Sequence, residues 1–268
     1  MKKNTLLMLI ALLSGLFANS IVSADWVTSI VNFAGNYKGN SSNADYYIAP
    51  HTSIAIDSNN KVHISYYNYS NGSIDYATNA SGFWVTSIID SVGNVSSSTS
   101  IGIDSNDKVH ISYYDRTNKD LKYVTNVSGS WVKSTIDSTA DIDGFSFISI
   151  GIDSNNKVYI SYYDNSNGNL KYATNVSGSW VKSTIDSAGY VGSSTSIGIA
   201  SNNKVHISYY DSTNGDLKYA TNASGSWVTS IIDSTNDVGK YNTSIAIDNS
   251  NKVHISYYDS SNDIIKYA

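Results

Sequence analysis

The sequence predicts an all-β fold, a five-bladed β-propeller of four-stranded blades that is closed by its N-terminal strand. Three observations predict it: one motif recurs five times, each repeat contains strand-like segments in the same order, and the composition favours strands and turns. The 268 residues include 22 Tyr and 18 Gly, and Ser, Asn, Thr and Ile are abundant. Tyr, Thr and Ile favour strands, whereas Asn, Gly and Ser favour turns.

The repeat is defined by the string KVHISYY. It begins at Lys61 and recurs, with spacings of 47, 49, 47 and 48 residues, at Lys108, Lys157 (as KVYISYY), Lys204 and Lys252. In an extended strand Val62 and Ile64 lie on one face, and His63 and Tyr67 lie on the other. Both faces carry large side chains, which is typical of sheets that are covered on both sides by neighbouring repeats.

Each repeat contains four predicted strands. The first corresponds to 52–57, 99–104, 147–153, 195–200 and 243–248, and the second is KVHISYY. The third ends in a Tyr-Ala/Val-Thr pattern, as at 74–78, and the fourth starts at a Trp. The turns DSNN at 57–60 and NASG at 79–82, with their copies, can close tight hairpins between these strands.

The order of strands at the two ends predicts how the ring closes. A fourth-type strand begins at Trp26, before the first complete repeat, whereas Ala268 ends a third-type strand. The last repeat therefore lacks its outer strand. We expect the N-terminal strand to supply it, because an open stack would leave unpaired edges.

Residues 1–24 resemble an export signal. Lys2 and Lys3 precede an apolar run at 6–17, and Val22-Ser23-Ala24 offers a cleavage site between small residues. We therefore expect a signal peptide at 1–24 and the propeller at 25–268, with a secreted, periplasmic or cell-surface location. The apolar run is short for a bilayer, so no membrane span is expected in the mature chain.

Charge and composition argue against several functions. The formal net charge is −5, and −7 without the two N-terminal lysines, which argues against nucleic acid and anionic membranes as partners. The chain has no Cys, which excludes disulfides and thiol nucleophiles. We expect no cofactor and a monomeric protein.

Repeats such as HISYYDSTNGDLKYATNASGSW at 206–227 resemble the tandem propeller repeats of secreted bacterial proteins with sialidase-like architecture. The layout is also similar to that of tachylectin-type sugar-binding lectins. The Asp-box motif of sialidases is absent, and the single Arg, Arg116, cannot form their arginine cluster. Five-bladed glycosidases use a catalytic Glu, and this sequence contains none.

We expect no catalytic residues. A catalytic site is a unique constellation, whereas nearly every polar residue here recurs in four or five repeats. A Ser-His-Asp site stays open as an alternative, although no nucleophile-elbow pattern occurs.

No metal site is expected either. The histidines at one repeat position (His63, His110, His206 and His254) would lie about 12 Å apart, while zinc needs ligands about 2 Å from one centre. The DSNN sequence forms a β-turn without an ion, and Ala200 replaces its Asp in the fourth repeat.

One rim of the propeller is predicted to bind a ligand. It carries the turn after each Tyr pair and the variable segments 32–50, 139–147 and 237–241. Tyr can stack on a sugar ring, and Asp can accept hydrogen bonds from sugar hydroxyls. The candidate residues are Tyr67, Tyr114, Tyr163, Tyr210, Tyr258, Asp115, Asp164, Asp211 and Asp259. The alternative is that both tyrosines of each pair belong to the core between blades and that each Asp only caps a turn.

The sequence favours a non-catalytic module that binds carbohydrates at several sites, because repetition produces multivalency. A protein-interaction or cell-surface scaffold stays open as an alternative, and a hydrolase with an unrecognised site is a third one. The expected partners are therefore glycans or a surface protein.

Overall fold

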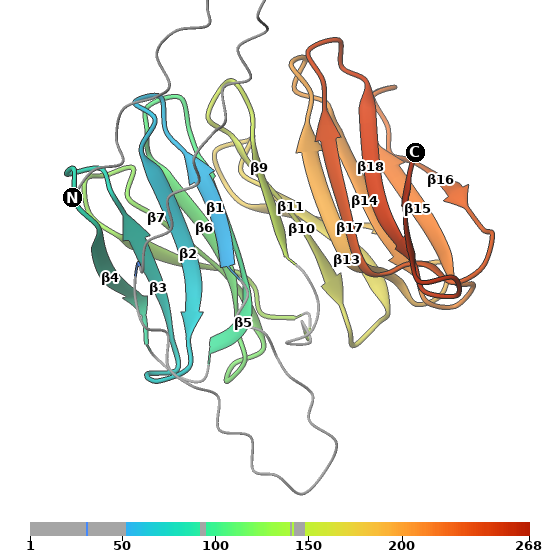
Figure 1. Cartoon of the computed structure of the whole chain (residues 1–268), viewed down its shortest axis with the longest axis horizontal. Coiled ribbons are helices and arrows are strands. Elements are labelled where there is room, and N and C mark those ends of the chain that lie inside the picture. Colours follow the sequence, from blue (N-terminus) through green and yellow to red (C-terminus); the bar gives the residue numbers. More distant parts are fainter. Residues whose placement is uncertain (1–30, 32–51, 92–94, 140, 142–147) are drawn as a thin grey trace, which may run out of the picture. The chain divides into compact units, whose positions relative to one another are not determined.

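The protein consists of antiparallel β-sheets throughout the part described by a computed structural model, which comprises residues 31, 52–91, 95–139, 141 and 148–268. Every regular element in these ranges is a strand, which confirms the all-β prediction (Figure 1). The predicted signal peptide and the N-terminal strand at Trp26 lie outside the described residues.

The strands form five sheets in chain order. Sheet 1 contains β1 (Thr52–Ile56), β2 (Val62–Asn68), β3 (Ser73–Thr78) and β4 (Val85–Asp90). Sheet 2 contains β5 (Val95–Ile103), β6 (Val109–Asp115), β7 (Asp120–Thr125) and β8 (Val132–Asp137). Sheet 3 contains β9 (Ser149–Ile152), β10 (Val158–Asp164), β11 (Asn169–Thr174) and β12 (Val181–Asp186). Sheet 4 contains β13 (Val191–Ile199), β14 (Val205–Asp211), β15 (Asp216–Thr221) and β16 (Val228–Asp233). Sheet 5 contains β17 (Val238–Ile247), β18 (Val253–Asp259) and β19 (Ile264–Tyr267).

Each sheet is a meander of hairpins, because short polar turns connect consecutive antiparallel strands. Residues at the same position in different repeats pair with equivalent residues on the neighbouring strands. Ile64 lies opposite Ile54 and Ala77, and Ile160 lies opposite Ile150 and Ala173. The four predicted strand types are therefore confirmed in the described repeats, with β5, β13 and β17 starting earlier than expected.

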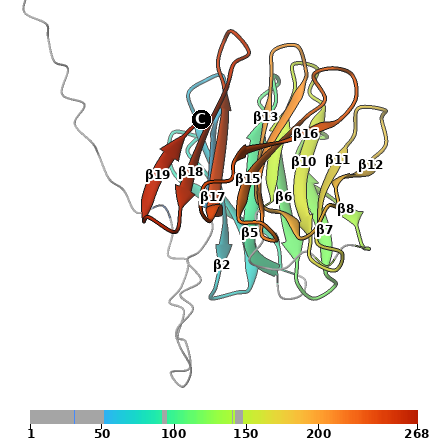
Figure 2. The same ribbon diagram turned by 90° about the vertical axis from the view of Figure 1, so that its right-hand side faces the viewer.

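Consecutive sheets pack face to face, and the first strands lie side by side, with β1 against β5, β5 against β9, β9 against β13, and β13 against β17. Figure 2 shows β17–β19 at one end of this series. The core lies between the sheets, where Tyr113, Tyr162 and Tyr209 are completely buried. This arrangement is consistent with a five-bladed propeller, since each sheet buries both faces only with its neighbours.

The two end sheets each keep one exposed face. Ile54 and Ile56 of β1 are exposed, as are Ile265 and Tyr267, which share one face of β19. The closed ring therefore stays a prediction, and its closing strand falls outside the described residues.

Candidate functional site

The tyrosines of the predicted ligand-binding rim are packed into the protein. Tyr67, Tyr114, Tyr163 and Tyr210 are buried, and Tyr258 in the end sheet is partly exposed. The hydroxyl of Tyr210 donates to Asp237 at 2.6 Å, and that of Tyr114 donates to Asp141 at 3.1 Å. Their rings fill the space between strands and loops, which leaves little ring surface for a sugar.

The aspartates of that rim cap the turns that follow them. Asp115 accepts hydrogen bonds from the backbone N–H groups of Thr117 and Asn118 at 3.1 and 3.2 Å, and from the Asn118 side chain at 2.9 Å. Asp211 and Asp259 have the same contacts, and Asp164 accepts from Asn167. All four aspartates are buried. Their observed role is structural, and their predicted ligand contacts stay untested.

The opposite rim is formed by the DSNN turns. Oδ1 of Asp57 accepts from the N–H groups of Asn59 and Lys61 at 2.9 and 2.8 Å, which is an Asx-turn. Asn60 has a φ of 58°, in the left-handed region that Asn tolerates better than most residues. The same geometry recurs at Asp104, Asp153 and Asp248.

Behind three of these turns, a histidine links the capping aspartate to a tyrosine. His63 lies 3.2 Å from Asp57 through Nε2 and 2.6 Å from the Tyr76 hydroxyl through Nδ1. In a neutral ring, Nε2 donates to the carboxylate and Nδ1 accepts from the phenol. The described repeats around His110 and His254 have the same chain of contacts.

Two repeats depart from this pattern. In sheet 3, Tyr159 replaces the histidine and donates directly to Asp153 at 2.7 Å. In sheet 4, Ala200 replaces the aspartate, and His206 keeps only its contacts with Tyr219 and Thr221 among those of the described chain. Burial lowers the pKa of His206, since no carboxylate stabilises the charged ring.

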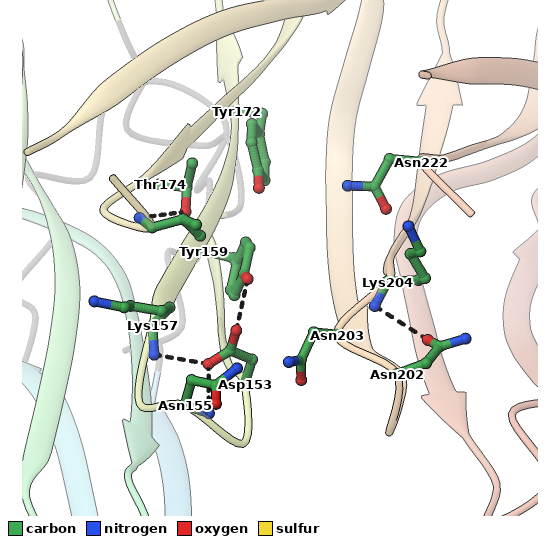
Figure 3. Close-up of a pocket in the computed structure, with 11 residues that line it drawn as sticks. Asp153, Asn155, Lys157, Tyr159, Tyr172, Thr174, Asn202, Asn203, Lys204 and Asn222 are labelled. Carbon is green, nitrogen blue, oxygen red and sulfur yellow. Dashed lines mark hydrogen bonds between the residues drawn. The ribbon is translucent and has the colours of Figure 1, made fainter. Parts of the chain in front are cut away.

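A polar cavity of about 600 Å³, widely open to solvent, lies between sheets 3 and 4 on this rim (Figure 3). Sheet 3 contributes the turn around Asp153 and Asn155, the ring of Tyr159, and the end of β11 at Tyr172. Sheet 4 contributes the turn 202–204 and Asn222. The two turns are joined by a hydrogen bond from the Ser154 hydroxyl to Asn203 at 3.0 Å.

Several polar groups in the cavity keep hydrogen-bonding capacity. Oδ1 of Asn222 accepts from the Val205 N–H, which leaves its NH₂ group, directed into the cavity in Figure 3, as a donor. Asn203 likewise uses Oδ1 for the bond to Ser154. Asn155 and Asn202 are exposed, and Lys204 lies beside them. The carboxylate of Asp153, in contrast, is already used by Tyr159 and two backbone N–H groups.

The sequence did not point to this cavity, because its walls come from turns of two different sheets. The DSNN and NASG turns are short and uniform, and only their juxtaposition across an interface forms a concave surface. One signal was available: Tyr159 interrupts the histidine position in the repeat that lines the cavity.

Within the described residues, no group of three or more His or Asp side chains could hold a metal ion. Among the same residues, no helix has the length and apolar character needed to cross a membrane.

Comparison with known proteins identifies the architecture. No family model matches the sequence, and no curated protein matches it. The structure is similar to that of the SapL1 lectin in complex with α-methyl fucoside, with a TM-score of 0.57 and 16% identity over 81% of this chain and 75% of that one. It is also similar to a mutant of Aleuria aurantia lectin in complex with Fucα1-6GlcNAc, with a TM-score of 0.54 and 12% identity over 78% and 71%. The structure is also similar to that of a Dyadobacter fermentans protein of unknown function, with a TM-score of 0.53 and 9% identity over 77% of this chain and 74% of that one. These likenesses show a shared fold.

Proposed function

We propose that this protein is a non-catalytic carbohydrate-binding module, and that the cavity between sheets 3 and 4 is a sugar-binding site. The observation that carries the proposal is the cavity itself, which combines a volume of about 600 Å³ with amide, hydroxyl and ammonium groups from two sheets. Sugars need several hydrogen-bond partners in a concave site, and a few polar groups in fixed positions fix their orientation.

The structural neighbours support the same function. SapL1 and the Aleuria aurantia lectin, which share the fold, were solved with fucosides. The residue types at the cavity recur at the interfaces between sheets 1 and 2 and between sheets 2 and 3, where Asn106, Asn126 and Asn175 occupy equivalent positions. Multivalent binding is therefore part of the proposal, as weak equivalent sites gain avidity on a polymeric surface.

A glycan array tests this function. We expect retention of the wild-type protein on a subset of glycans, with α-methyl fucoside as the first soluble competitor. Retention should fall steeply when the density of immobilised glycan is lowered, because one protein molecule then reaches fewer glycans at once. An array with no retained glycan, at a protein concentration where SapL1 binds, would contradict the function and favour a protein-interaction scaffold.

We also propose that the protein is secreted and that it is a monomer in which the N-terminal strand closes the ring. Support for the closing strand comes from an apolar cavity of about 200 Å³ lined by Tyr219, Ile232, Val253, Ile255 and Ala268. The equivalent side chains surround Trp131, Trp180 and Trp227 at the other interfaces. The only other tryptophans of the chain are Trp84 and Trp26, and Trp26 begins the predicted closing strand.

Deleting residues 25–31 tests the closing strand. We expect a markedly lower melting temperature or aggregation, because the edge of β19 would lose its partner. An unchanged, cooperative melting transition would contradict it.

A further inference from the structure

The turn at Ala200 in sheet 4 has the backbone of the other DSNN turns but not their aspartate. The Ala200 N–H donates to the Lys204 carbonyl at 2.9 Å, and the Asn203 N–H donates to the Ala200 carbonyl at 2.8 Å. The two corresponding bonds in the turn at Asp104 are both 3.0 Å long. Asn203 has a φ of 60°, and its counterpart Asp107 has a φ of 59°. The groups that surround position 200 therefore keep the arrangement that they have around an aspartate.

Three donors hold the carboxylate of that aspartate in sheet 2. Oδ1 of Asp104 accepts from the backbone N–H groups of Asn106 and Lys108 at 2.9 and 2.8 Å. Oδ2 lies 3.2 Å from Nε2 of His110. Asp104 is buried, and hydrogen bonds to an ionised acceptor are stronger than neutral ones. The turn and the histidine together form a cradle whose shape and donors match one planar carboxylate.

In sheet 4 the same donors have no carboxylate to bind. The backbone N–H of Asn202 has no acceptor among the described residues, and that of Lys204 donates to Oδ1 of Asn202 at 3.2 Å (Figure 3). Nε2 of His206 has no hydrogen-bond partner in the part of the chain that the structure describes, although the residue is only 7% exposed. This nitrogen is not one of the fully buried unpartnered atoms, so it is open to solvent.

The orientation of His206 directs Nε2 at position 200. Its Nδ1 atom contacts the hydroxyl of Tyr219, as the equivalent atom of His110 contacts Tyr123. When Nδ1 accepts from the phenol, the proton of a neutral imidazole is on Nε2. His206 therefore presents an N–H donor at the point where His110 meets its aspartate.

Two features make this position accessible to an anion. Asp153, the counterpart of Ala200 in sheet 3, lines the solvent-open cavity beside sheet 4, so position 200 borders the corresponding surface beside sheet 5. Lys252 of sheet 5 has the repeat position that Lys204 has at that cavity. Lys252 is exposed and forms no ion pair within the described ranges, so its ammonium group contributes a positive potential there.

We propose that position 200 is a carboxylate-binding site, in which the carboxylate of a ligand takes the place of the missing aspartate. It accepts hydrogen bonds from the N–H groups of Asn202 and Lys204 and from Nε2 of His206. The ligand is a small organic acid or a uronic acid residue of a glycan, which share this group. The site is separate from the cavity between sheets 3 and 4 and does not depend on the function proposed for that cavity.

NMR titration of the imidazole C–H signals of the full-length protein tests the site. The probes are acetate and methyl glucuronide, each compared with sodium chloride at equal ionic strength. The variant Ala200→Asp fills the site with a side chain that the other repeats carry at this position, so its fold is expected to persist. The reverse variant, Asp104→Ala, removes the carboxylate beside His110. Three histidines whose Nε2 atoms already meet an aspartate are internal controls, namely His63, His110 and His254.

We expect a saturable shift of the His206 signals in the wild type, with an affinity that is about tenfold or more weaker in Ala200→Asp. The control histidines should not respond, and His110 should begin to respond in Asp104→Ala. Tighter binding of methyl glucuronide than of acetate assigns the ligand to acidic glycans, and equal affinities assign it to small acids. A His206 signal that moves no more than in sodium chloride, or equally in Ala200→Asp, would overturn the proposal. Because α-methyl fucoside is expected to leave this signal unchanged, failure of this site and failure of the sugar cavity are distinguishable.

Discussion

The hydroxyl of Tyr162 donates a 2.8 Å hydrogen bond to Asp137 at the end of the outer strand of the preceding sheet. Lys171 and Lys182 reach the two oxygens of the same carboxylate at 2.6 and 2.8 Å. The equivalent bond joins Tyr113 to Asp90, Tyr209 to Asp186 and Tyr257 to Asp233. Each interface therefore buries a polar contact whose members come from two sheets, and removal of one member leaves a buried partner unsatisfied.

The variant Tyr162→Phe tests this contact. We expect a loss of about 1–3 kcal/mol in the free energy of unfolding, because Asp137 loses a buried donor while the ring still packs. Chemical denaturation measures it. Tyr190→Phe removes an exposed hydroxyl and should change stability by less than about 0.5 kcal/mol. Equal stabilities of the two variants would contradict the structural role of the bond.

Stability should fall in acid. Burial alone would raise the pKa of Asp137, but its bonds to Lys171, Lys182 and Thr139 hold the pKa well below the ordinary value of 3.8. A carboxyl with a depressed folded-state pKa stabilises fully above its unfolded-state value and loses that contribution as the pH falls towards its folded-state pKa. The pKa values of Asp186 and Asp233 are also lowered.

The melting temperature should therefore drop between about pH 5 and pH 2, with a smaller drop for Asp137→Asn. Burial raises the pKa of Asp120 and Asp216, which opposes this loss without reversing it. A melting temperature that stays level down to about pH 2 would argue against these ion pairs.

The substitution Ala200→Asp should restore the chain of contacts at His206. In sheet 2, burial lowers the pKa of His110, and Asp104 partly offsets the effect. A carboxylate at position 200 would face the Nε2 atom of His206 and raise the pKa of that histidine relative to the wild type. NMR titration of the imidazole C–H signals measures the change. Ala200→Asn is the uncharged control. An equal shift of the His206 pKa in both variants would exclude an effect of the charge.

The variant Asp211→Ala should lower stability. The buried carboxylate of Asp211 accepts hydrogen bonds from the N–H groups of Thr213 and Asn214, so its removal should cost about 1–2 kcal/mol. Asp211→Asn keeps an acceptor oxygen and should recover part of the loss. A ligand-binding residue on the surface would instead leave the melting temperature nearly unchanged, so a neutral Asp211→Ala would favour the ligand-binding role.

The repeat made most of the fold predictable. Five copies of KVHISYY, each flanked by turn residues, placed four strand types that the structure confirms wherever the repeats are described. The site was less predictable. The alternation of side chains along a strand places Tyr67 and Tyr114 on one face of their strands, but it does not show what covers that face. The loops and neighbouring sheets bury both rings. The cavity at Asn202 and Asn222 depends on the spacing of two sheets, which a linear pattern does not encode.

The most direct test of the central claim is a calorimetric titration with a glycan selected on the array, or with α-methyl fucoside, on three proteins. They are the wild type, the cavity variant Asn155→Ala/Asn202→Ala, and the control Asn165→Ala, which removes an exposed amide after β10 on the opposite rim. We predict saturable binding by the wild type and the control, with at least one site weakened about tenfold or more in the cavity variant at an unchanged melting temperature. Equal binding isotherms for the cavity variant and the wild type would contradict the assignment of the cavity as a sugar-binding site.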